Sequence, residues 1–202
     1  SGNVCWDLCC GKGRHSIYLN KKGYRVIGTD LSECSIHEAN ESANESLEFY
    51  RHDMRHLFRT NYFDAIFNLF TSFGYFEKRE DDLRVFDSVQ KALKQNGLFV
   101  FDYLNSEYVK NIIVANDTKV IDGITFQITK RIENNTVIKN IDFKDKGEAF
   151  HFEERVKLFD KSYFEDLAKE CNLTILNMFG NYQLQEFDLK TSPRLILVLQ
   201  KK

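Results

Sequence analysis

Three aspartates follow short apolar segments at regular intervals near the start of the chain. Asp7 precedes a turn that contains Gly11 and Gly13, and Asp53 lies as far beyond Asp30 as Asp30 lies beyond Asp7. Glycines in such a turn let the backbone approach a ligand closely. A carboxylate about 20 residues after a glycine-rich turn commonly holds the hydroxyls of a ribose. The spacing therefore predicts a nucleoside-binding site.

Charge distinguishes between the nucleoside cofactors that such a site could take. A dinucleotide brings a pyrophosphate to the helix N-terminus after the turn, and Asp7 would repel that group. S-adenosylmethionine carries an ammonium and a sulfonium group, which Asp7 would attract. Ser16 also stands where the dinucleotide fingerprint has its third glycine. We therefore expect S-adenosylmethionine, and an NAD-dependent oxidoreductase is the second hypothesis.

The segment Asp7–Gly13 resembles the first motif of class I S-adenosylmethionine-dependent methyltransferases, an acid followed by Gly-x-Gly-x-Gly. Cys9 replaces the first glycine, at a position used mainly through its backbone. The resemblance implies that Asp7 faces the methionine ammonium and that Cys9, Gly11 and Gly13 contact the cofactor. It also implies four further groups of cofactor contacts: Asp30 on the ribose, Leu31 on the adenine face, Asp53 and Met54 on the adenine edge, and Asn68 near the methionine.

Composition limits the compartment and the partners. The chain has 202 residues, a formal net charge of -2 and no apolar run long enough to span a bilayer, so we expect neither nucleic acid nor a membrane as partner. Its five cysteines form no Cys-x-x-Cys pair and no cluster at zinc spacing. We therefore expect reduced thiols, a cytoplasmic location and no metal.

Apolar strands alternate with amphipathic helices along most of the chain, which predicts one α/β domain over residues 1–202. Its expected core is a Rossmann-like, doubly wound sheet of seven mostly parallel strands with an antiparallel closing strand. The expected strands are Val4–Leu8, Arg25–Thr29, Leu47–Tyr50, Phe63–Phe70, Leu98–Tyr103, Leu173–Met178 and Arg194–Leu199. The expected helices are His15–Lys21, a segment around Ile36 and Ala39, Arg79–Gln95 and Ser162–Cys171.

Residues 117–158 interrupt this alternation with strand-like runs separated by turn sequences. The runs are Lys119–Val120, Gly123–Arg131, Val137–Phe143 and Ala149–Leu158. They predict a small inserted antiparallel β flap that packs over one edge of the main sheet. Similar insertions in small-molecule methyltransferases cover the acceptor pocket. A stabilising role, or an oligomer formed through the flap, is the alternative.

The acceptor site is expected after the strand Phe63–Phe70. The sequence there lacks the Asn-Pro-Pro-Tyr of methyltransferases that act on adenine or glutamine amides, which favours a small-molecule acceptor. The candidate catalytic residues are His15, whose unperturbed pKa suits a general base, with Tyr75 and Tyr103. The candidate substrate-binding residues are Tyr18, Phe73, Asn105 and Arg155. A methyltransferase-like module that binds the cofactor without catalysis is the third hypothesis.

Overall fold

The computed structural model describes residues 3–70 and 72–202, and its main element is a seven-stranded sheet. The strand order is β10-β11-β5-β4-β1-β2-β3, and all neighbours from β5 to β3 pair in parallel. The strands are β1 (Val4–Leu8), β2 (Arg25–Asp30), β3 (Leu47–Arg51), β4 (Phe63–Asn68), β5 (Leu93–Leu104), β10 (Leu173–Phe179) and β11 (Arg194–Lys201). This arrangement confirms the predicted fold class.

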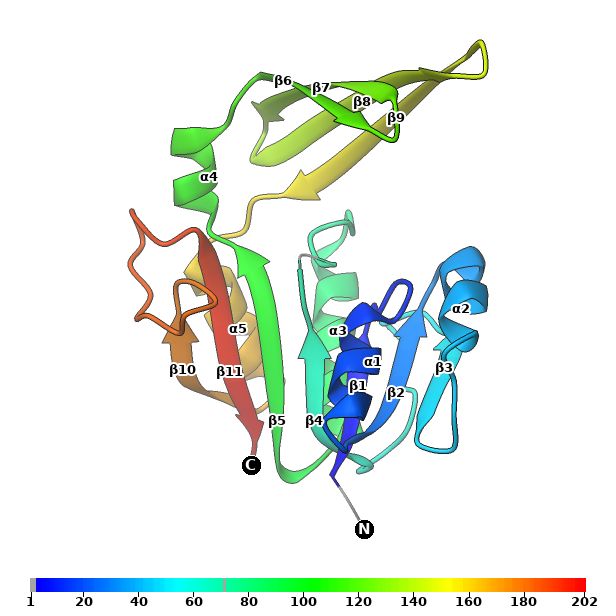
Figure 1. The fold of residues 1–202 in the computed structure, drawn as a ribbon. Helices are drawn as coiled ribbons and strands as arrows, with labels where there is room; N and C mark the ends of the chain where they lie inside the picture. Colours follow the sequence, from blue (N-terminus) through cyan, green and yellow to red (C-terminus); the bar gives the residue numbers. More distant parts are fainter. Residues whose placement is uncertain (1–2, 71) are drawn as a thin grey trace.

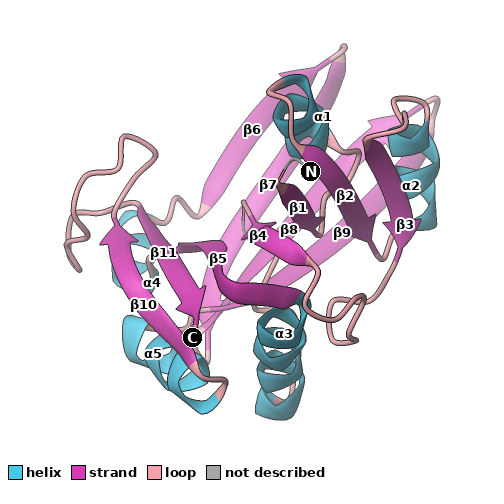
Figure 2. Ribbon diagram, turned by 90° about the horizontal axis from the view of Figure 1, so that it is seen from below, coloured by secondary structure: helices cyan, strands magenta, loops and turns pink. Residues whose placement is uncertain are grey.

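Helices cover both faces of this sheet, as its apolar strands require. Figure 2 shows α1 (Arg14–Lys21) and α2 (Glu33–Asn40) on one face, and α3 (Arg79–Ala92) and α5 (Lys161–Glu170) on the other. Each face has its own apolar core. Val26 and Phe49 belong to the smaller core, and Phe86 and Phe164 to the larger one.

The predicted closing hairpin is also confirmed. Strand β11 pairs antiparallel with both β5 and β10, so it lies between two strands that precede it in the sequence. Its first residue, Arg194, stands opposite Leu104 at the carboxyl end of β5. This register brings the loop before β11 to the edge of the sheet where the carboxyl ends of the parallel strands lie.

The inserted flap forms a separate four-stranded antiparallel sheet in the order β6-β7-β8-β9. Its strands are β6 (Asn116–Ile121), β7 (Ile124–Glu133), β8 (Thr136–Asp145) and β9 (Glu148–Lys157). Figure 1 shows the flap above the carboxyl ends of the parallel strands. Ligands of open α/β sheets bind beyond these ends, so the flap stands on the ligand-binding side of the molecule.

Several boundaries differ from the predictions, and one helix was not predicted. Helix α3 ends at Ala92 rather than Gln95, because Leu93 already pairs with Phe63 as the start of β5. Strand β4 ends at Asn68 rather than Phe70, whose φ of 70° does not continue a strand. The short helix α4 (Ser106–Ile112) was not predicted. No helix in the described part of the chain has the length and apolar character needed to cross a membrane.

Candidate active site

The glycine-containing turn between β1 and α1 is held in a left-handed backbone conformation. Cys9, Gly11 and Gly13 have φ values of 65°, 55° and 80°. A Cβ on Gly13 would lie 2.7 Å from the ring of Phe49, whereas one on Gly11 would meet no atom within 4 Å. Gly13 is therefore required by the packing beneath the turn. Gly11 leaves open space above the turn, which suits a close ligand.

The carboxylate of Asp7 lies beneath the first turn of α1. Asp7 is 2% exposed, and the hydroxyl of Ser16 donates a hydrogen bond to its Oδ2 at 2.6 Å. Burial raises the pKa of this carboxyl above its usual value, although the hydrogen bond from Ser16 opposes the shift. A cationic ligand group would favour the ionised form. Ser16 stands where the dinucleotide fingerprint has its third glycine, and here its hydroxyl holds the carboxylate of Asp7 in place.

Asp30 connects the end of β2 to the glycine turn. Its Oδ2 accepts a hydrogen bond from the backbone N–H of Gly11, and its Oδ1 accepts one from Ser32, each at 2.9 Å. The side chain of Ser32 caps α2, as its type predicts. The neighbouring Leu31 is 60% exposed. A carboxylate and an apolar side chain therefore stand side by side at the edge of the turn.

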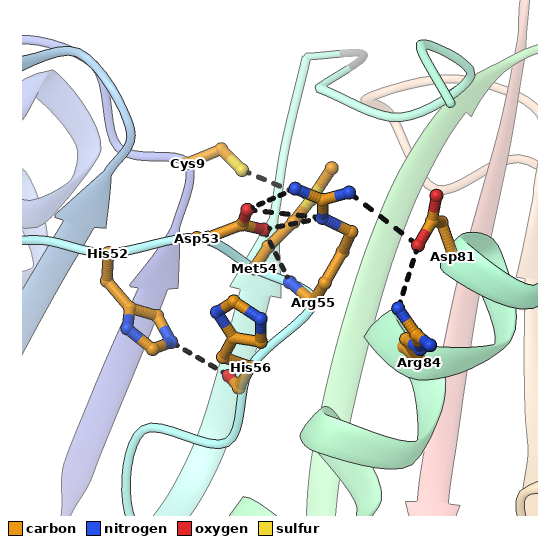
Figure 3. Close-up of polar contacts among 8 residues, drawn as sticks. All are labelled: Cys9, His52, Asp53, Met54, Arg55, His56, Asp81 and Arg84. Carbon is orange, nitrogen blue, oxygen red and sulfur yellow. Dashed lines mark hydrogen bonds and ion pairs between the residues drawn. The ribbon is translucent and has the colours of Figure 1, made fainter. Parts of the chain in front are cut away.

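Asp53 is held by Arg55, two residues further along the chain. The guanidinium donates to both carboxylate oxygens, with Nη2 at 2.6 Å from Oδ2, and lowers the pKa of Asp53 to about 2. Figure 3 shows Arg55 between Asp53 and Asp81, whose carboxylate lies 3.6 Å from Nη1 of Arg55. Asp53 is thus ionised near neutral pH and fixed in direction.

Two further contacts lie beneath the glycine turn, one made by Cys9 and one by Asn68. The thiol of Cys9 lies 3.4 Å from the sulfur of Met54, which is nearly buried. Asn68 is 1% exposed and donates from its Nδ2 to the carbonyl of Leu8, but its buried Oδ1 has no partner among the described residues. Because an unsatisfied buried acceptor is costly, Asn68 offers a hydrogen-bond acceptor that a ligand N–H group could use.

A cavity of about 340 Å³ lies beyond the carboxyl ends of β4 and β5. Its lining residues come from four segments of the chain: Arg14 and His15 from α1, Leu69 and Phe70 from the loop after β4, Asp102 from β5, and Tyr182 from the loop before β11. Arg14 donates to Nε2 of His15 at 3.0 Å, since a guanidinium has no acceptor. The guanidinium carbon also lies 6.0 Å from the centroid of the Phe70 ring.

Three predicted acceptor-site residues have structural roles instead. Phe73 is fully buried in the larger core. Tyr103 is also fully buried, and its hydroxyl donates to the backbone carbonyl of Lys157 in the flap. Asn105 is 3% exposed; its side chain caps α4 and donates to the carbonyls of Leu189 and Ser192. In this structure none of the three has a surface that a substrate could reach.

The other predicted acceptor-side residues are exposed but do not all lie together. Tyr75 is 46% exposed, and its hydroxyl donates to Glu154 of the flap. Tyr18 is 60% exposed on α1, outside the lining of the cavity. Arg155 pairs with Glu153 at 2.7 Å on the flap. Only His15 of the predicted acceptor-side residues lines the cavity.

Sequence reasoning missed the roles of Arg55, Asp102 and Tyr182. A signal existed for Asp102, because it follows a run of apolar residues in a buried strand, and a buried carboxylate requires partners. No comparable signal marks Tyr182, which lies in a polar loop far along the chain. Among residues 3–70 and 72–202, no three His, Cys, Asp or Glu side chains are grouped so that they could hold a metal ion.

These residues fit an S-adenosyl nucleoside. The open space at Gly11, the unpartnered Oδ1 of Asn68 and the buried carboxylate of Asp7 suit a ligand with an ammonium group. The carboxylates of Asp30 and Asp53 would instead repel a pyrophosphate at this edge. The site therefore has the acceptors for an amine and for hydroxyls.

Comparisons with known proteins agree with this chemistry. The profile of a methyltransferase domain matches residues 6–97. The chain is 28% identical over 207 residues to YqeM of Bacillus subtilis (strain 168), whose name describes a methyltransferase of unconfirmed activity; the match spans 96% of this chain and 83% of YqeM. It is 31% identical over 188 residues to a glycine/sarcosine N-methyltransferase of Parasynechococcus marenigrum (strain WH8102), across 88% of this chain and 65% of that protein.

Solved structures share the fold over the whole chain. An S-adenosylmethionine-dependent methyltransferase from Clostridium acetobutylicum ATCC 824 superposes with a TM-score of 0.87 at 21% identity, covering 100% of this chain and 85% of that one. CalS10, an amino pentose methyltransferase of Micromonospora echinaspora solved with S-adenosylmethionine bound, has a TM-score of 0.76 at 15% identity, covering 100% and 84%. At these identities the likeness concerns the fold.

Proposed function

By its domain and its fold the chain is a class I S-adenosylmethionine-dependent methyltransferase, and we propose that it methylates the amine nitrogen of a small molecule. The observation that carries the proposal is the cavity beyond β4 and β5, which combines the rings of Phe70 and Tyr182 with the imidazole of His15. Aromatic faces attract the ammonium form of an amine through cation–π contact, worth about 0.5–2 kcal/mol each. The cavity is also of a size that suits a small ligand.

The names of similar proteins support an amine acceptor. The relative at 31% identity is named for N-methylation of glycine and sarcosine. CalS10 is named for an amino pentose, and KedS8 of Streptoalloteichus is a sugar N-methyltransferase with a TM-score of 0.78 to this chain. These acceptors differ in size but share a small amine. We therefore place the acceptor class at amino acids and amino sugars.

The cofactor end of the site is assigned to the residues around the glycine turn. When bound, S-adenosylmethionine supplies a methyl group on a positively charged sulfur. Asp7 and the Oδ1 of Asn68 would hold its ammonium, and Asp30 its ribose hydroxyls. The fixed carboxylate of Asp53 would accept from its adenine amino group, with Leu31 and Met54 on the two sides of the base. Cys9 and Gly11 supply the backbone of the turn.

The acceptor end needs orientation more than acid–base strength, because the sulfonium is a good leaving group. Holding two reacting groups in line can supply about 7–11 kcal/mol of the barrier. Phe70 and Tyr182 would orient the amine, and the flap above them would limit access of water. His15 would take the proton that the amine releases at Nε2, the atom to which Arg14 donates in this structure.

The test is a methyl-transfer assay with labelled cofactor and a panel of glycine, sarcosine and amino sugars. We expect transfer to at least one amine, with the label on nitrogen in the mass spectrum of the product. Transfer only to oxygen or sulfur acceptors in a wider metabolite extract would overturn the amine assignment. Calorimetry with S-adenosylhomocysteine and with NADH checks the cofactor independently, since only the first should bind.

His15→Ala tests the proposed proton acceptor once an amine is known. We expect kcat to fall by about a hundredfold or more with cofactor affinity unchanged. His37→Ala, an exposed histidine on α2, is the matched control. If both variants retain the kcat of the parent protein, the proton leaves by another route and His15 only lines the cavity.

A further inference from the structure

Asp102 is a buried carboxylate at the carboxyl end of β5, and it binds four chain segments together. It is 2% exposed. Its Oδ1 accepts from Nε of Arg194 at 2.8 Å, and its Oδ2 accepts from the backbone N–H of Phe70 at 3.1 Å and from the hydroxyl of Tyr182 at 3.0 Å. The partners come from β11, the loop after β4 and the loop before β11. Three donors from three segments fix the position of this buried carboxylate.

Phe70 is the strained partner in this group. Its φ of 70° is in the left-handed region, which a residue with a bulky side chain rarely adopts. Its ring is 69% exposed, so burial of the side chain does not explain the conformation. The hydrogen bond from its N–H to Asp102 fixes the peptide at this point. The strained backbone directs the ring towards the cavity, where it meets Arg14.

Tyr182 is the second exposed ring that Asp102 holds. It is 59% exposed and lies in the loop between β10 and β11, far from Phe70 in the sequence. Its hydroxyl bond to Asp102 brings the ring to the same cavity. Arg194 pairs with the same buried carboxylate at 2.8 Å and holds it from the β11 side. One side chain therefore sets the positions of both rings.

We propose that Asp102 is a positioning residue for the acceptor. By accepting from the Phe70 amide and the Tyr182 hydroxyl, it holds two aromatic rings at the acceptor cavity and acts on the acceptor through them. The expected effect on acceptor KM rests on the proposed function, whereas the expected effect on the position of Phe70 does not. The cofactor residues lie at the ends of β1 to β4, and none of them is a partner of Asp102.

Asp102→Asn separates this role from a general contribution to stability. An asparagine can keep one acceptor towards Arg194, but its amide nitrogen then faces the N–H of Phe70, which cannot accept. We expect amide hydrogen exchange at Phe70, measured by NMR with saturating S-adenosylhomocysteine, to be about tenfold faster or more. In the transfer assay we expect acceptor KM to rise by about tenfold, with affinity for S-adenosylhomocysteine within about twofold of the parent.

Asp64→Asn is the matched control. Asp64 also pairs with a cation, Lys94, at 2.8 Å, and also accepts from a backbone N–H, that of Val4, but it lies at the opposite end of the sheet. Asp64→Asn should lower Tm, but it should change neither amide hydrogen exchange at Phe70 nor the KM for the acceptor. Tyr182→Phe, which removes one hydroxyl at an exposed ring, serves as a milder variant if Asp102→Asn does not fold. This variant should raise acceptor KM and leave Tm nearly unchanged.

The outcomes separate this inference from the proposed function. Unchanged Phe70 exchange in a folded Asp102→Asn protein overturns the positioning role, whatever the acceptor. A fall in Tm with KM and Phe70 exchange unchanged also overturns it, because a structural role alone predicts that pattern. If the parent protein methylates no amine while exchange at Phe70 increases, the amine assignment fails and the positioning of the ring stands.

Discussion

The hydroxyl of Tyr75 donates a hydrogen bond to the carboxylate of Glu154 at 2.8 Å and joins the loop after β4 to the flap. Lys157, at the end of β9, adds two contacts with the same loop. Its backbone N–H donates to the carbonyl of Gly74 at 2.9 Å, and its Nζ donates to the carbonyl of Glu77 at 2.6 Å. The loop that follows β4 is therefore attached to the flap by three hydrogen bonds. The pKa of Tyr75 is raised by burial and by Glu154, which makes its phenol a poor base.

We expect loss of this contact to affect the acceptor and not the cofactor. Tyr75→Phe and Glu154→Gln each loosen the attachment of the flap, so acceptor KM should rise several-fold with S-adenosylhomocysteine affinity unchanged. A double-mutant cycle should give a coupling energy of about 0.2–1 kcal/mol, as is typical of a partly exposed polar pair. Asp142→Ala, on an exposed pair of the flap with His151, is the control. If the effects of the two substitutions on acceptor KM are additive, the hydrogen bond between Tyr75 and Glu154 does not contribute to acceptor binding.

Asp30→Ala should weaken cofactor binding. The change removes the proposed partner of the ribose hydroxyls and leaves the N–H of Gly11 without its acceptor. The loss should be about 1.5–3 kcal/mol, or roughly tenfold to a hundredfold in Kd, measured by calorimetry with S-adenosylhomocysteine. Asp87→Ala, which removes an exposed ion pair with Lys91, should leave Kd unchanged. Equal affinity of Asp30→Ala and the parent protein would mean that the cofactor lies elsewhere.

Asp82 should make the protein less stable as the pH rises from about 4 to 6. Burial raises its pKa from 3.8 to about 6. Between these values the folded carboxyl keeps its proton and the unfolded one loses it, so unfolding is favoured as the pH rises. The shift corresponds to about 3 kcal/mol at most, complete above about pH 7.

Asp82→Asn should therefore stabilise the protein above about pH 7, and the gain should shrink towards about pH 4. Urea unfolding at the two pH values measures it. Asp81→Asn, whose carboxylate lies next in sequence and pairs with Arg84, is the control and should show no such increase with pH. A pH-independent difference between Asp82→Asn and the parent would show that Asp82 is ionised in the folded state throughout.

One cysteine should react rapidly in the folded protein. Cys34 is exposed, whereas Cys5, Cys10 and Cys171 are buried and Cys9 is half-buried. Burial raises the pKa of Cys9 to about 12 and that of Cys5 to about 11, so few thiolates form near neutral pH. A thiol assay should count one fast group, which Cys34→Ser removes, and the remaining thiols only after denaturation. Fast labelling of Cys9 would show that the glycine turn opens.

The fold could be predicted closely because its signals are local. The alternation of strands and helices, the turns of the flap and the N-cap at Ser32 depend on neighbouring residues. Helix α4 was missed because its seven residues give little periodicity. The boundary after α3 was misplaced because the turn residues Asn96 and Gly97 lie within β5, where pairing with β4 extends the strand back to Leu93.

The acceptor site was harder to predict because it depends on burial between distant segments. Tyr103 and Phe73 were expected in the pocket on the basis of their rings, but contacts with the flap and with α5 place both in the core. Tyr182 reaches the cavity only because β11 pairs antiparallel with β5. By contrast, the cofactor candidates follow strands that are consecutive in the sequence, so their common edge could be inferred from topology.

The place of β11 between β5 and β10 has a consequence for synthesis of the chain. A ribosome completes β5 long before β11, so the edge of β5 stays unpaired while α4, the flap, α5 and β10 are made. An open strand edge can associate with another chain, and long-range pairing is slow to form. Arg194 reaches Asp102 only when β11 has joined the sheet. The cofactor residues can therefore assemble early in translation, whereas the acceptor cavity is completed only after β11 has been made.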